Sequence, residues 1–128
     1  MLIKVFHNVS VTPEGHPAGM LDGYHQGHDL ALVATVRVVR EPGVQKADEE
    51  LAEEMFALFN VGDDPAYGEP SLIAQEYRFR GNRSLSVGDV VEVDGRPYAV
   101  ARFGYTRIEP PQARHLVRWH GHGTNSLD

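Results

Sequence analysis

Three histidines and one aspartate lie in a glycine-rich stretch, where their side chains could bind a metal ion. Imidazole nitrogens and carboxylate oxygens bind zinc, with a water in an open position. The candidate ligands are His16, His25, His28 and Asp29. Their spacing is a weak signal, because an H-x-x-H pair lacks the helix of an H-E-x-x-H motif. A metal-dependent hydrolase or lyase is therefore one hypothesis, and a loop without a metal is the interpretation that we favour.

A second candidate site combines arginines with aromatic residues. If residues 78–83 are extended, Arg78 and Arg80 share one face and can bind carboxylates or phosphates as forked donors. Aromatic neighbours suit stacking on a partner or on a base. The hypothesis is a partner-binding surface. Its residues are Tyr77, Arg78, Phe79, Arg80, Asn82, Arg83, Ser84 and Ser86.

A structural role for the same segment is the alternative that we favour. Ser84 and Ser86 share a face of an extended chain, and Asp89 can cap a local turn because aspartate readily bonds nearby backbone. Asp94-Gly95 predicts a two-residue hairpin turn, since both central positions need positive φ. The predicted turn residues are Gly88, Asp89, Asp94 and Gly95.

Common catalytic signatures are missing from the sequence. There is no cysteine, which rules out disulfides, thiolate zinc sites and cysteine nucleophiles. There is also no G-x-S-x-G elbow, Walker loop or G-x-G-x-x-G motif. We therefore expect no cofactor, assign no catalytic residue, and expect a binding protein rather than an enzyme.

Hydrophobic periodicity predicts the first elements. Residues 2–11 alternate like a half-buried strand, whereas residues 30–39 are apolar on both faces like a central strand. Residues 48–59 predict an amphipathic helix, because Leu51 and Met55 begin a stripe at helical spacing. That stripe is typical of core packing.

The remaining pattern predicts the fold class. Residues 88–94 and 97–107 read as two strands around the Asp94-Gly95 turn. We expect a single α+β domain in residues 1–110, with a small, mostly antiparallel sheet packed by one main helix. Residues 111–128 form a C-terminal extension, with an edge strand in 113–119 and then a frayed tail.

The charge of the 128-residue chain is uneven. Its net charge is −6, with four basic and thirteen acidic residues in 1–77 but eight arginines and five acidic residues in 78–128. A solvated acidic helix is the simpler explanation, and a dipolar molecule that meets an acidic partner is the other. Net negative charge disfavours nucleic acid, although binding through the arginine-rich half stays as an alternative. No apolar run is long enough for a membrane span, so we expect a cytoplasmic protein with no membrane partner.

Residues 50–108 resemble the YodL-like domain family. That family has a helix ending in Phe-Asn, then R-G-x-S-L-S-V-x-D-V-V, then a hairpin closing on Phe-Gly or Gly-Phe. The matching stretches here are EEMFALFN (53–60), RGNRSLSVGDVVEV (80–93) and YAVARFGY (98–105). This sequence departs from the family pattern at Gly88, where the family usually has serine.

The resemblance also implies a biological context for the protein. The first 40 residues look like small proteins of actinobacterial plasmids, phages and integrative elements. Together they imply a small accessory domain of mobile genetic elements, often found beside anti-defence and conjugation functions, and they imply no catalytic residues. The leading hypothesis is a non-enzymatic accessory protein that binds a macromolecule, with a protein as the expected partner, in host-element conflict. Its oligomeric state stays open.

Overall fold

A computed structural model describes residues 1–39, 43 and 45–118. In this part of the chain, one six-stranded sheet has the order β5-β4-β3-β1-β2-β6, and the single parallel pair is β2 with β6. The predicted α+β class, with a mostly antiparallel sheet, is confirmed. The elements are β1 (Leu2–Asn8), α1 (Ala18–Asp22), β2 (Leu30–Arg37), α2 (Asp48–Val61), η1 (Pro65–Tyr67), α3 (Leu72–Phe79), β3 (Val90–Val93), β4 (Arg96–Val100), β5 (Tyr105–Arg107), η2 (Ala113–His115) and β6 (Leu116–Val117).

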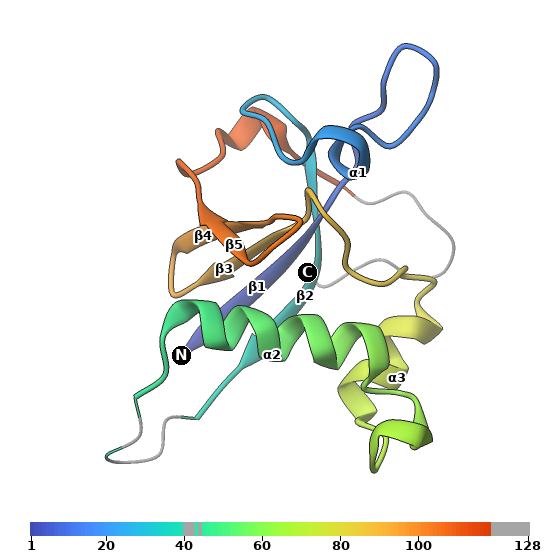
Figure 1. Cartoon of the computed structure of the whole chain (residues 1–128), viewed down its shortest axis with the longest axis vertical. Helices are drawn as coiled ribbons and strands as arrows, with labels where there is room; N and C mark the ends of the chain where they lie inside the picture. The colour runs from blue at the N-terminus through green and yellow to red at the C-terminus, as the bar shows by residue number, and fades with distance from the viewer. Residues whose placement is uncertain (40–42, 44, 119–128) are drawn as a thin grey trace.

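The main core lies between the sheet and the helix α2, which runs across one face of the strands (Figure 1). Ile3 and Val5 alternate toward this face of β1, and both are fully buried. From α2, Leu51, Met55 and Phe59 pack against them at helical spacing. Burial of each such side chain stabilises the fold by about 1.5–3 kcal/mol, so this stripe is the main support of α2.

Loops cover the opposite face of the sheet. Phe6, Leu30 and Val90 form a second apolar cluster there, with Tyr24 and Ile108 packed against it. These two residues belong to segments far apart in the sequence. The second face therefore brings the loop before β2 close to the segment after β5.

A β-bulge interrupts the pairing of β1 with β2. Val5 pairs with Ala34 and Phe6 pairs with Leu32, so Val33 is an extra residue without a partner in β1. Val33 and Ala34 both join the core on the helix side. A bulge leaves a backbone group outside the ladder, and the carbonyl of Val33 finds its partner in a side chain described below.

The expected strands differ from the observed ones in their limits, and two of them differ most. The first ends at Asn8 rather than at residue 11, because the following chain bonds to other segments: the N–H of Ala18 donates to the carbonyl of Ser10. The expected strand 97–107 is divided into β4 and β5. Gly104, with φ +73°, accepts a hydrogen bond from the N–H of Ala101, which closes a tight turn between them.

The hairpin turn at Asp94-Gly95 is confirmed. The two residues have φ +46° and +86° and connect β3 to β4. A second longer helix, α3, follows the loop after α2. A strand at Leu116–Val117 lies within the predicted edge segment and pairs in parallel with β2, whereas the predicted frayed tail lies outside the described residues. Among the helices described, none has the length and apolar character needed to cross a membrane.

Candidate binding site

The predicted arginine surface begins inside a helix, so the expectation that residues 78–83 are extended is wrong. α3 continues to Phe79 because its N-terminus is capped and its inner side is apolar. The hydroxyl of Ser71 accepts from the N–H of Ala74, and Ala74 and Tyr77 are buried one turn apart. Arg78 and Arg80 therefore do not share the face of a strand.

Arg83 is paired with a buried carboxylate. Its two terminal nitrogens donate to the two oxygens of Asp89 at 2.7 and 2.8 Å, and Asp89 has no exposed surface. The same carboxylate accepts from the backbone N–H groups of Asn8 and Ser86, each at 2.8 Å. Asp89 thus joins β1 to the segment before β3. A buried charge needs such partners, because an unpaired one costs several kcal/mol.

Arg78 fastens α3 to neighbouring segments. Its guanidinium donates to the carbonyls of Phe59 and Asn60 at the end of α2 and to the hydroxyl of Ser84. Asn60 in turn exchanges two hydrogen bonds with the backbone of Leu85, at 2.7 and 3.2 Å. The end of α2, α3 and the segment before β3 are therefore held together by side chains that pair with backbone groups.

Arg80 supplies the hydrogen-bond partner of the carbonyl group at the β-bulge. One terminal nitrogen donates to the carbonyl of Val33 at 3.1 Å, and the other pairs with Glu76 at 3.3 Å. Its side chain is only 12% exposed. The guanidinium groups of Arg78, Arg80 and Arg83 therefore donate hydrogen bonds to other groups of the same protein. They do not form the free docking surface that the sequence suggested, because buried carbonyls and Asp89 require their hydrogen bonds.

His7 and Tyr77 form a buried pair under this network. The hydroxyl of Tyr77 donates to the carbonyl of Arg83, so Nε2 of His7 carries the proton that bonds the Tyr77 oxygen at 2.6 Å. Burial lowers the pKa of His7 to about 4 and raises the pKa of Tyr77. His7 is therefore a neutral core histidine.

Little of the predicted surface is accessible to a partner. Of its eight residues, Phe79 alone is exposed, at 88%, and the others are buried or partly buried. Asn82 is buried and its Oδ1 has no hydrogen-bond partner among the described residues. Gly88, with φ +92°, lies against Gly19 of α1. Residues 77–86 therefore serve mainly to hold elements of the fold together.

The four candidate metal ligands do not form one cluster, although the rings of His25 and His28 lie 5.5 Å apart. His16 is exposed in the turn before α1. Nδ1 of His28 bonds to the side chain of Asn8 and accepts from the N–H of His25, while Asp29 pairs with His115 at 2.9 Å. In the part of the chain that the structure describes, no group of three metal-ligating side chains could hold an ion. The alternative hypothesis of a metal site at these four residues therefore has no ligand cluster to support it in the described ranges.

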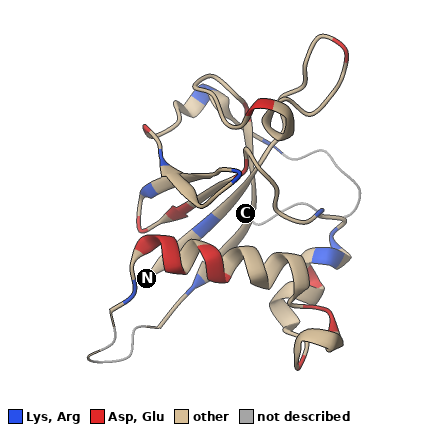
Figure 2. Cartoon of the chain, viewed as in Figure 1, with Lys and Arg blue, Asp and Glu red and all other residues tan. Residues whose placement is uncertain are grey.

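A groove between α2 and the β4–β5 turn was not predicted. It has a volume of about 440 Å³ and is open to solvent. Acidic residues gather in the first half of α2 (Figure 2). We call this feature the acidic groove. Its lining residues are Lys46, Glu49, Glu50, Glu53, Glu54, Gly104 and Tyr105.

The carboxylates of the acidic groove differ in their partners. Glu53 accepts from the hydroxyl of Tyr105 at 2.8 Å, and Glu54 pairs with Lys46 at 2.8 Å. Burial and the bond to Glu53 raise the pKa of Tyr105. Glu49 and Glu50 are exposed and pair with no cation in the described ranges. Two uncompensated charges therefore lie beside a partly buried aromatic ring.

Asp48 fixes the position of the groove. Arg96 of β4 donates to its two oxygens at 2.6 and 3.0 Å, and the hydroxyl of Tyr98 donates at 2.6 Å. These bonds, the one from Arg96 first, lower the pKa of Asp48 to about 2. The start of α2 is thus tied to β4, which holds the glutamates over the β4–β5 turn.

The sequence predicts that these glutamates lie on a solvated face of the helix. The contact with Tyr105 joins residues more than fifty positions apart, and hydrophobic periodicity contains no signal for such a contact. The available signal was charge density: Glu49, Glu50, Glu53 and Glu54 fall within six residues.

Comparisons with protein-family models, curated proteins and solved structures gave no match to this chain. The resemblance of residues 50–108 to YodL-like domains therefore stays a prediction from the sequence.

Proposed function

We propose that this protein is a non-enzymatic accessory protein that binds another protein through the acidic groove. The partner would present a segment rich in arginine or lysine. The setting remains the one that the sequence resemblance implies, a cytoplasmic protein of a mobile genetic element in host-element conflict. The arginine surface has no part in this proposal, because its donors are used internally.

The observation that carries the proposal is the pair of uncompensated carboxylates in a concave site. Glu49 and Glu50 lie along α2, and the half-buried Tyr105 lies opposite them in the same groove. An arginine side chain suits this combination, since its stem packs on apolar surface while its guanidinium meets carboxylates. Cation–π contact with the Tyr105 ring adds to the attraction.

Phe103 supports a macromolecular partner rather than a small ion. It is 95% exposed and directly precedes Gly104 in the β4–β5 turn. Exposed aromatic residues next to charged rims are common at protein interfaces. A basic segment that enters the groove would also cover this ring, which adds apolar contact to the charge pairing.

The overall charge favours the same partner class. A net charge of −6 attracts basic proteins and repels the phosphates of nucleic acids. Electrostatic attraction of this kind mainly speeds association and selects partners by charge.

Fluorescence anisotropy with a labelled arginine-rich peptide tests the proposal. The variant Glu49→Gln/Glu50→Gln removes two charges from the groove, and Glu14→Gln/Glu69→Gln removes two exposed charges elsewhere. We expect the first to weaken binding about tenfold, because each exposed ion pair contributes up to about 1 kcal/mol, and the second to change it by less than about twofold.

Two outcomes would overturn the proposal. One is equal weakening by both double variants, which would mean attraction by net charge alone. The other is no saturable binding of the peptide by the unchanged protein. Tighter binding of a single-stranded oligonucleotide than of the peptide would favour the nucleic-acid alternative instead.

A further inference from the structure

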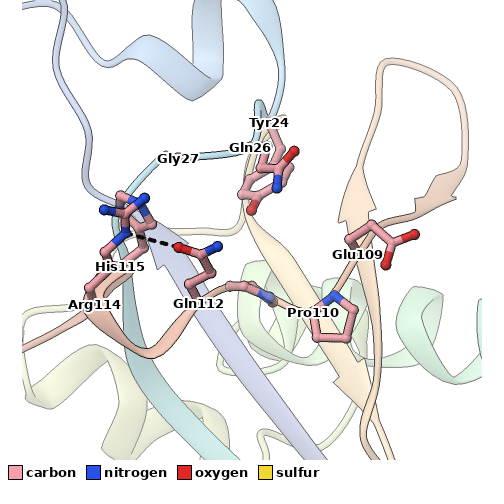
Figure 3. Close-up of a pocket in the computed structure, with 9 residues that line it drawn as sticks. Tyr24, Gln26, Gly27, Glu109, Pro110, Gln112, Arg114 and His115 are labelled. Atoms are coloured by element: carbon pink, nitrogen blue, oxygen red, sulfur yellow. Dashed lines mark hydrogen bonds between the residues drawn. The ribbon is translucent and has the colours of Figure 1, made fainter.

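A second hollow lies on the loop-covered face of the sheet, away from α2. It has a volume of about 240 Å³ and is enclosed by the loop around Tyr24–Gly27 and by the segment Glu109–His115. Figure 3 shows Arg114, His115 and Gln112 on one side of it, Tyr24 and Gln26 on another, and Glu109 at the far end. We call it the loop pocket.

Both walls of the loop pocket are tied to other parts of the fold. On one side, the N–H of Asp29 donates to the hydroxyl of Ser10, in the segment after β1, at 2.7 Å. On the other side, the N–H of Ile108 donates to the carbonyl of Pro97 at 3.1 Å. The pair His115–Asp29, at 2.9 Å, then links the two walls. A site whose walls are fixed before binding costs less conformational entropy to occupy.

Unused donors converge on this pocket. Nε of Arg114 donates to Oε1 of Gln112 at 2.9 Å, which orients the guanidinium. Its two terminal amino groups have no partner in the ranges 1–39, 43 and 45–118, and neither has the carboxamide of Gln26. The ring of Tyr24 stands edge-on to His28, which fixes its position at the pocket. Several hydrogen-bond donors thus face one small volume.

Glu109 and the adjoining prolines define the other end. Glu109 lines the end away from Arg114, and its carboxylate is directed away from the other lining side chains (Figure 3). Pro110 and Pro111 line the wall between them with rigid rings. The pocket therefore has donors at one end, and at the other end the flexible side chain of Glu109 supplies an acceptor if it turns inward.

We propose that the loop pocket binds a small phosphate monoester that also carries hydroxyl groups. The forked terminal amino groups of Arg114 match phosphate oxygens, and the carboxamide of Gln26 adds a neutral donor. The carboxylate of Glu109 accepts from a ligand hydroxyl. The volume is smaller than that of common drug-sized sites, so the ligand is compact.

Isothermal titration with glycerol 3-phosphate tests this proposal, with glycerol and acetate as comparison ligands. The variant Arg114→Gln removes the guanidinium, and Arg102→Gln removes an exposed arginine outside the pocket. We expect saturable binding of glycerol 3-phosphate that Arg114→Gln weakens about tenfold and Arg102→Gln changes by less than about twofold.

Glycerol and acetate should bind far more weakly, because glycerol lacks the phosphate and acetate lacks both the phosphate and the hydroxyl groups. The proposal is overturned if glycerol 3-phosphate does not bind, if acetate binds equally well, or if both arginine variants weaken binding to the same extent.

Discussion

Arg83 and Asp89 show at the residue scale why the arginine-rich segment is internal. The Arg83 side chain is still 34% exposed, yet the carboxylate that it pairs with is completely buried. Asp89 also accepts two backbone N–H groups. The guanidinium is therefore the counter-charge of a buried group, and a partner could recruit it only by leaving Asp89 uncompensated.

The first prediction concerns this pair. Arg83→Met leaves the buried carboxylate of Asp89 without its cation, so we expect the free energy of unfolding to fall by about 3 kcal/mol. Urea denaturation measures this change. Arg102→Met, at an exposed position, should change stability by less than about 0.5 kcal/mol. Equal stability of the two variants would contradict the role assigned to Arg83.

The second prediction is a dependence of stability on pH. Burial lowers the pKa of His7 from 6.5 to about 4 in the folded state. Between these pH values the unfolded chain binds more protons, so the free energy of unfolding falls as the pH decreases from 6.5 toward 4. The contribution of His7 is complete above pH 6.5, and its loss amounts to about 3 kcal/mol.

Urea denaturation across this pH range measures the effect. The pKa of His28 is also lowered by burial and acts in the same direction, so the comparison needs a variant. His7→Gln removes the titrating group and should flatten most of the slope. An unchanged slope in His7→Gln would show that His7 is not the neutral buried group described above.

At the scale of elements, two glycines allow α1 to approach the turn before β3. A Cβ atom on Gly88 would lie 2.5 Å from Cα of Gly19, and a Cβ on Gly19 would lie 2.7 Å from Nδ2 of Asn8. Gly88 also has a positive φ of +92°. This contact gives a physical reason for glycine at position 88, where the resembled family usually has serine.

The third prediction compares two glycines that both have positive φ. Gly95 has φ +86° and open space around its missing Cβ, so Gly95→Ala should cost only the conformational strain of about 1 kcal/mol. Gly88→Ala adds a clash with backbone and should cost at least about 2 kcal/mol more. Thermal unfolding of both variants measures the difference, and similar melting temperatures would contradict the close packing of α1.

Local patterns made the strands, α2 and the Asp94-Gly95 turn predictable, since each follows from periodicity or from backbone preference within a few residues. The bulge at Val33 and the pairing of Arg80 with its carbonyl were not predictable in this way. Both features depend on which distant segments come into contact in the folded chain. Local patterns in a single sequence do not predict such contacts. The same holds for Tyr105 beside Glu53, and therefore for the acidic groove.

Over the whole molecule, some charged side chains are paired within the fold, and others are exposed and can meet a partner. Arg78, Arg80, Arg83 and Arg96 are engaged with other groups of the fold. The carboxylates of Glu49 and Glu50 are exposed in a groove. The acidic groove is thus available to a charged partner, whereas these four arginines are not; Arg102 and Arg114 are exposed elsewhere on the surface.

The fourth prediction follows from this distribution. Binding of the arginine-rich peptide should weaken at least about tenfold when salt rises from about 50 mM to about 500 mM, because exposed charges are screened over shorter distances. Anisotropy titrations at the two salt concentrations measure it. Salt-independent affinity would mean that apolar contact, centred on Phe103, dominates instead.

The most direct test of the binding surface is an amide NMR titration of the protein with the arginine-rich peptide. We predict chemical-shift changes in the first half of α2 and in residues 102–105, which line or adjoin the acidic groove. Changes confined to residues 78–86 would contradict this account and would restore the arginine segment as the docking surface.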